Sequence, residues 1–138
     1  MRKAVTIAIA MLCAVACRMA DTGSRTAVQS IALTDSLLAA GGISDTLKMG
    51  RLHAGEVAVK SFALQNLTQN PLVIIRYENS CGCTSFIYDR KPVMPGQQTV
   101  IECRFDSSGT FGWQMKPAKF HIAGIAEPLR IIVEAEVD

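Results

Sequence analysis

The sequence predicts an all-β domain, an antiparallel sandwich of two sheets, from three observations. After residue 45, apolar side chains recur at every second position in several short runs, which is the period of a half-buried strand. Clusters of turn-forming residues, such as Thr68-Gln69-Asn70-Pro71, separate these runs. Roughly six or seven short strands in about 95 residues are typical of an immunoglobulin-like sandwich.

The first three strands are expected at residues 47–52, 57–66 and 72–77. The turn His53-Ala54-Gly55-Glu56 separates the first two strands, and Phe62 and Leu64 share one face of the second. The third strand is apolar on both faces except at Arg76, which predicts a central position in its sheet.

The later strands are expected at residues 86–88, 99–106, 114–122 and 129–137, the first of them a short edge piece. In the strand at 99–106, Ile101, Cys103 and Phe105 share one face, which places Cys103 among core residues. The last strand alternates most cleanly, and its inward residues are Leu129, Ile131, Val133, Ala135 and Val137.

The amino-terminal segment has the layout of a secretory signal peptide, residues 1–16. A positive Met1-Arg2-Lys3 precedes an apolar run that is too short to span a bilayer, which needs about 20 residues. Leu12-Cys13-Ala14-Val15-Ala16-Cys17 resembles a bacterial lipobox, although that pattern prefers Leu, Val or Ile where Ala14 stands. We therefore expect lipidation at Cys17; the alternative is a soluble periplasmic protein with a free Cys17.

Residues 17–45 lack strong alternation and contain the flexible pair Gly41-Gly42. We expect a lipidated tether with at most one short helix, followed by the sandwich domain at 46–138. The alternative is that this segment packs on the domain as an extra element. Several acyl chains on Cys17 would anchor the protein stably, in the bacterial cell envelope and facing the periplasm or the exterior.

Composition is that of one small exported domain. The net charge is only +2, and no cluster of basic residues indicates a nucleic-acid partner. Of the five cysteines, Cys13 leaves with the leader and Cys17 is expected to carry lipid, which leaves Cys81, Cys83 and Cys103. An odd number in an exported protein leaves one thiol free or pairs it with another molecule.

The pair Cys81-Gly82-Cys83 is the most distinctive motif. In an extended strand its two Cα atoms would lie about 6.6 Å apart, near the limit of about 6.8 Å for a disulfide. A positive φ at Gly82 would bring them closer. Three interpretations stay open: a structural bridge from one of the pair to Cys103 or buried thiols, a reducible bridge within the pair, or a two-sulfur clamp for Cu(I).

A catalytic set is not expected, and neither is a bound cofactor. A cysteine nucleophile needs a nearby base, usually histidine. His121 lies on the phase opposite to Phe120 and Ile122 and should face solvent, and His53 lies in a turn. The sequence shows no Gly-rich phosphate loop and no Cys-x-x-Cys, so we expect a protein that is not an enzyme.

Several blocks of the chain resemble the bacterial DUF1573 family over residues 45–138. The blocks are Phe62-Ala63-Leu64-Gln65-Asn66, Pro71-Leu72-Val73-Ile74, Ser80-Cys81-Gly82-Cys83-Thr84, Pro95-Gly96, Phe105-Asp106 and Gly109-x-Phe111. The resemblance implies an immunoglobulin-like sandwich similar to domains of the ASPM/SPD-2/Hydin type, frequent lipoprotein leaders and an undefined function. Family members often have Gly-x-Phe-x-Lys; here the lysine is displaced to Lys116, to which no role is carried over.

These observations favour an envelope lipoprotein that binds a protein or glycan partner through its strand edges or loops. The alternative function is a thiol site at Cys81 and Cys83, with or without Cys103, that binds Cu(I) or cycles between dithiol and disulfide. A thiol enzyme acting on peptidoglycan or protein disulfides is a third, weaker alternative, because it needs a histidine within about 3 Å of a sulfur.

Overall fold

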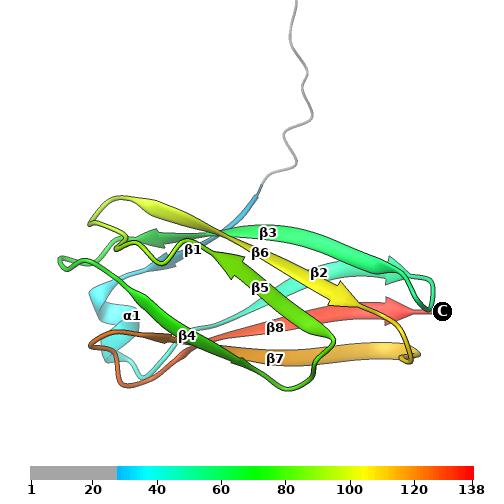
Figure 1. The fold of residues 1–138 in the computed structure, drawn as a ribbon. Coiled ribbons are helices and arrows are strands. Elements are labelled where there is room, and N and C mark those ends of the chain that lie inside the picture. The colour runs from blue at the N-terminus through cyan, green and yellow to red at the C-terminus, as the bar shows by residue number, and fades with distance from the viewer. Residues whose placement is uncertain (1–27) are drawn as a thin grey trace, which may run out of the picture.

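Two four-stranded sheets lie face to face in a computed structural model that describes residues 28–138 (Figure 1). The strands are β1 (Gln29–Leu33), β2 (Ser44–Leu52), β3 (Val57–Asn66), β4 (Ile74–Asn79), β5 (Thr84–Tyr88), β6 (Gln98–Asp106), β7 (Gly112–Ile122) and β8 (Leu129–Val137), and the helix is α1 (Asp35–Ala39). The sheet orders are β1-β3-β6-β5 and β2-β8-β7-β4. The predicted all-β sandwich is confirmed.

Each sheet is mixed, so the prediction of a purely antiparallel sandwich is wrong. β1 runs parallel to β3, and β2 runs parallel to β8. Both parallel strands lie at a sheet edge and come from the amino-terminal part of the described chain. Strand alternation predicts which face is buried but carries no information on strand direction.

The predicted tether reaches too far along the chain. β1 pairs with β3 in the register Ile31↔Leu64, and Ile31 and Leu33 are buried in the core. The helix α1 begins after Thr34, whose Oγ1 accepts a hydrogen bond from the backbone N–H of Leu37 at 3.3 Å. From residue 29 onward the segment is therefore part of the sandwich, which was the alternative interpretation; residues 17–27 lie outside the described part.

The core lies between the two inner faces. The alternation predicted for β8 holds at every position, because its five inward residues are all buried. Across the interior, the rings of Phe62 on β3 and Phe120 on β7 meet edge to face with centroids 6.3 Å apart. This packing fixes the two sheets against each other and positions the loops that connect them.

The strand expected to be central, β4, is instead an edge strand beside β7. Leu72 and Ile74 are buried, but Ile75 is 54% exposed, and the pairing with β7 shifts between Ile74 and Arg76. The apolar run suggested burial on both faces, yet only part of it faces the core. The prediction failed because the described residues form two layers, so the outer face of each sheet meets water and outward apolar residues such as Ile75 do not mark a central strand.

A buried polar corner closes the end of β3. The Nδ2 of Asn66 donates to the carbonyl oxygens of Asn70 and Val93, both at 2.8 Å. Its Oδ1 accepts from the backbone N–H of Thr68 at 2.9 Å and from the Thr68 hydroxyl at 2.7 Å. The fully buried Asn66 amide thus has all four of its hydrogen bonds.

Candidate functional site

The loop that contains Cys81 and Cys83 joins β4 of one sheet to β5 of the other. The two cysteines form a disulfide, and their Cα atoms lie 5.2 Å apart, closer than in an extended strand. A turn at residues 82–83 shortens the distance, and Gly82 does not adopt positive φ. The pair thus comes close without the positive φ that glycine allows, and a Cβ at this position would meet no atom within 4 Å.

The ends of this loop are fixed while its centre is open to solvent. The backbone N–H of Ser80 donates to the carbonyl of Pro117 at 3.2 Å, and the N–H of Asp106 donates to the carbonyl of Cys83 at 2.8 Å. Both cysteines are half-buried, Cys83 packs against the core, and Gly82 is exposed. The disulfide is thus held in place and accessible to a small reductant.

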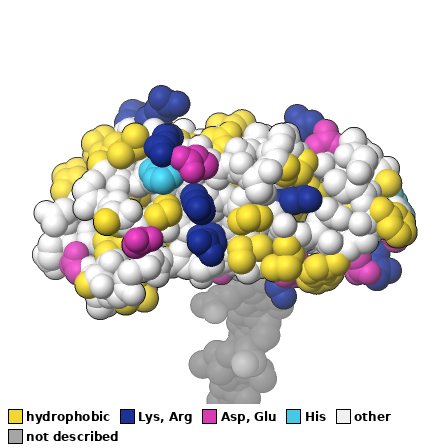
Figure 2. All heavy atoms as spheres, turned by 90° about the horizontal axis from the view of Figure 1, so that it is seen from below, with side chains coloured by type: hydrophobic (Ala, Val, Ile, Leu, Met, Phe, Trp, Pro, Cys, Tyr) yellow, Lys and Arg dark blue, Asp and Glu magenta, His cyan; other side chains and the backbone are white. Residues whose placement is uncertain are grey.

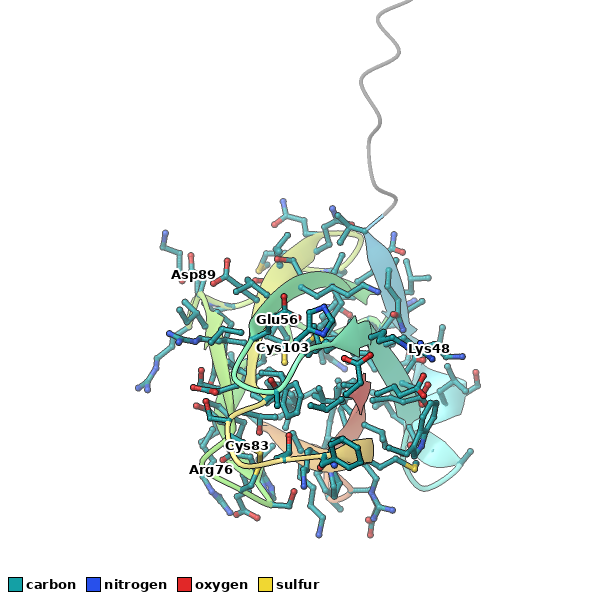
Figure 3. All side chains as sticks on the ribbon, turned by 90° about the vertical axis from the view of Figure 1, so that its right-hand side faces the viewer. Lys48, Glu56, Arg76, Cys83, Asp89 and Cys103 are labelled. Atoms are coloured by element: carbon teal, nitrogen blue, oxygen red, sulfur yellow. A yellow bond between two sulfur atoms is a disulfide. The ribbon has the colours of Figure 1, made fainter. Side chains whose placement is uncertain are left out.

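Cys103 does not join this pair. It carries a free thiol, fully buried among core residues of β6, and burial raises its pKa to about 12. Figure 3 shows Cys103 between the two layers and Cys83 near the edge formed by β4 and β5. The bridge lies within the pair, so the alternative of a bridge from Cys81 or Cys83 to Cys103 is wrong.

Both histidines lie beside carboxylates. The Nδ1 of the exposed His53 lies 2.8 Å from Oδ1 of Asp138. His121, expected to face solvent, is half-buried, and its Nε2 lies 3.3 Å from Oε1 of Glu78, which also pairs with Arg76 at 2.6 Å. Within residues 28–138, neither histidine has a hydrogen bond to a cysteine sulfur.

In residues 28–138, no group of three or more His, Cys, Asp or Glu side chains lies close enough together to hold a metal ion. The sulfurs of Cys81 and Cys83 are bonded to each other. A Cu(I) clamp at this pair would therefore need the disulfide to be reduced first, because the thiolate is the ligand. The predicted leader and the lipidation at Cys17 lie outside the described residues.

An exposed row of apolar side chains on β7, which the sequence reasoning missed, is a second candidate site. In the second half of β7 the inward phase carries the buried Ala118, Phe120 and Ile122. In the first half of β7, the inward positions hold the polar Gln114 and Lys116, and the apolar residues stand at the outward positions. We call its members, Trp113, Met115 and Pro117, the β7 stripe.

The β7 stripe lies where β7 has lost one neighbour, since pairing with β4 ends at Asn79↔Ala118. Trp113 is 61% exposed, and Phe111, just before the strand, is 79% exposed. Figure 2 shows this outer face, on which groups of hydrophobic side chains lie among charged ones. The signal available from the sequence was the reversal of the apolar phase between Pro117 and Ala118.

Among residues 28–138, no helix has the length and apolar character needed to cross a membrane. Residues 43–137 match the DUF1573 family, whose description is "protein of unknown function". No curated protein matches the chain.

Two solved structures show the same fold. A protein of unknown function from Porphyromonas gingivalis W83 is 22% identical, with a TM-score of 0.58 over 84% of this chain and 51% of that one. The VesB protease of Vibrio cholerae is 17% identical, with a TM-score of 0.52 over 67% of this chain and 30% of the protease. The chain thus spans about half the length of the Porphyromonas protein and a smaller part of the protease.

Proposed function

The chain belongs to the DUF1573 family of proteins of unknown function, and we propose that it is a non-enzymatic binding module of the bacterial cell envelope. The observation that carries this proposal is the β7 stripe together with Phe111. Each is a large apolar group kept in water, although burial of such groups is the main force that stabilises folded proteins.

The composition of this surface supports binding. Aromatic residues and methionine are enriched where proteins contact their partners, and contiguous exposed apolar patches mark interaction sites. Beside Trp113 and Met115, the neighbouring strands carry two ion pairs, Arg51 with Glu136 and Lys48 with Glu134. An apolar centre with a polar rim is the usual anatomy of a contact surface.

The absence of catalysis is part of the proposal. Within residues 28–138 the exposed sulfurs are oxidised, and the one free thiol is buried with a raised pKa. His53 lies beside Asp138 and His121 beside Glu78, and neither histidine makes a hydrogen bond to a cysteine sulfur in the described residues. A nucleophile within reach of a base, which thiol catalysis requires, is not formed in this part of the chain.

The envelope location is supported by the leader and by chemistry. A signal peptide ahead of Cys17 would export the chain, several acyl chains would hold it to a membrane, and a disulfide persists in oxidising compartments. The partner would be a protein or glycan of the envelope. A Cys17→Ser variant should leave the membrane fraction and lack the mass of the acyl chains; unchanged membrane attachment would contradict lipidation.

Site-specific crosslinking in intact cells tests the binding function. A photo-reactive amino acid at Met115 of the full chain should yield a discrete adduct with an envelope component. The matched control is Ile87, which is 68% exposed on the other sheet and should give none. An absence of adducts at Met115, or equal yields at both positions, would remove the proposed function.

A thiol redox site is the second candidate, favoured by the half-exposed Cys81–Cys83 disulfide. In this step a partner dithiol would give two electrons and two protons to the disulfide, leaving two thiols here and a disulfide on the partner. Titration in glutathione buffers with mass spectrometry should show reversible reduction confined to this pair. A bridge that stays oxidised throughout physiological potentials would exclude this candidate.

A further inference from the structure

A hollow of about 230 Å³ opens beside Trp113 on the outer face of the sheet β2-β8-β7-β4. It lies over three neighbouring strands, because Trp113 on β7 is opposite Glu136 on β8, which is opposite Arg51 on β2. The next outward row places Met115 opposite Glu134, which is opposite Lys48. The hollow therefore has an apolar wall on one side and a charged wall on the other.

An irregularity of β2 opens this hollow. The register with β8 shifts between Lys48 and Gly50, and Gly50 has φ +92°. This conformation strains any residue with a Cβ, so glycine is required here by the backbone and leaves no side chain over the sheet. The bulge therefore creates space on a face that side chains would otherwise fill.

The charged wall is electrically balanced. Arg51 Nη2 lies 3.0 Å from Glu136 Oε2, and Lys48 Nζ lies 3.9 Å from Glu134 Oε1. Two positive and two negative groups cancel, so the wall favours neither an anion nor a cation. Each pair uses only part of its capacity, because a guanidinium has five donors, an ammonium three and a carboxylate about four acceptor positions.

We propose that this hollow binds a neutral saccharide chain, with one sugar ring stacked on the indole of Trp113. A pyranose ring has an apolar C–H face and a rim of hydroxyls that donate and accept hydrogen bonds. The apolar face matches Trp113, and the hydroxyls match the paired charges that line the hollow. This inference rests on the proposed function and names the class of its partner.

The hollow is less suitable for the two other kinds of partner that bind apolar surfaces, a protein and a lipid bilayer. A bilayer, or a protein that filled the hollow itself instead of leaving the charged pairs at its rim, would remove water from the four charged groups without replacing all of their hydrogen bonds, which is costly. A saccharide replaces that water with hydroxyls. The charged wall thus favours a saccharide as the occupant of the hollow itself.

The experiment uses Trp113 as its own reporter, because it is the only tryptophan in the chain. The full-length protein is titrated with two neutral probes, the hexamers of N-acetylglucosamine and of glucose in β-1,4 linkage. At least one probe should change the tryptophan emission in a saturable way, with the same dissociation constant by calorimetry. Silence with both hexamers overturns the inference.

Variants locate the site. By calorimetry, Trp113→Ala should weaken binding at least 10-fold, Trp113→Phe less, and Arg51→Gln and Glu136→Gln by several-fold each. Ile87→Ala, on the other sheet, should bind as the parent does, and circular dichroism verifies that each variant is folded. Equal affinity of Trp113→Ala and the parent would overturn the inference.

The remaining outcomes separate this inference from the proposed function. Binding to neutral phosphatidylcholine vesicles without saccharide binding assigns the face to a membrane and overturns the inference. A protein adduct at Met115 without saccharide binding overturns it too, yet leaves the binding function standing. An absence of any adduct removes the function itself.

Discussion

The polar corner at Asn66 is buried, whereas the Cys81–Cys83 loop is half-exposed, although each follows the end of a strand. At the corner, one amide makes four hydrogen bonds to three residues of its surroundings. In the loop, the two sulfurs are bonded to each other, and Cys81 Sγ makes a long contact of 4.0 Å with the Thr84 hydroxyl.

The difference separates residues that hold the fold from residues that are available for function. Removing a buried amide that makes four hydrogen bonds loses all four at once and leaves at least one buried donor, the Thr68 N–H, unpaired, which is expensive. Removing a disulfide that closes a loop of only three residues restores little chain entropy. Substitutions at the corner should therefore change the stability of the protein, whereas substitutions in the loop should mainly change its thiol chemistry.

The largest effect is expected at the corner. Asn66→Ala removes four hydrogen bonds and leaves the Thr68 N–H without a partner, whereas the Val93 carbonyl keeps the N–H of Leu72 and the Asn70 carbonyl keeps the Thr68 hydroxyl. It should lower the free energy of unfolding by about 3 kcal/mol. Urea denaturation measures this value. Asn70→Ala is the matched control, since only its backbone takes part in the corner; it should cost less than about 0.5 kcal/mol. Equal costs would refute the account of the corner.

Cys103 gives a third case. It is as buried as Asn66, but it packs among apolar side chains of the core. Cys103→Ser places a hydroxyl among core side chains and should destabilise by about 2 kcal/mol. Cys103→Ala, which leaves a small cavity without a polar group, should cost less. If serine were tolerated as well as alanine in urea denaturation, the core around Cys103 would not be dry.

The loop itself should contribute less. The double variant Cys81→Ser/Cys83→Ser is expected to lose about 1.5 kcal/mol or less, because the bridge closes a three-residue loop. The measurement is again urea denaturation, compared with Gly82→Ala as a local control that keeps the bridge and meets no atom. A loss of the size expected at Asn66 would mean that the bridge holds the two sheets together.

A change of stability with pH is expected as well, and it appears only in alkaline solution. Burial raises the pKa of the Cys103 thiol from 9.0 to about 12, so the native protein keeps a proton that the unfolded chain releases. This contribution is fully present below pH 9 and is lost as the pH rises toward 12. The stability of the parent should fall more steeply across this window than that of Cys103→Ala. Parallel curves would contradict the assigned pKa.

The same protonation state predicts a labelling pattern. Iodoacetamide at pH 8 should not modify Cys103 in the folded protein, since only the thiolate reacts. After mild reduction, Cys81 and Cys83 should be labelled first, and Cys103 only in denaturant. Peptide mass spectrometry reads all three sites, and early labelling of Cys103 would show that its part of the core opens.

Local pattern predicted much of the fold and little of the site. The strand at Val57–Asn66 and the final strand at Leu129–Val137 were predicted with their bounds, because long clean alternation is a strong signal. β1 was missed because five residues are too few to show a period. The β7 stripe was missed because the strand was treated as having one phase throughout, whereas its apolar phase reverses midway.

By itself, the sequence determined the class of the fold, the inward row of most strands and the burial of Cys103. Those properties depend on which side chains stand at alternate positions, and that information is local. Only the tertiary structure decided that β4 lies at an edge, that two strands run parallel and that Cys81 bonds to Cys83 rather than to Cys103. These outcomes depend on contacts between residues far apart in the chain or on the path of a turn, which strand periodicity does not specify.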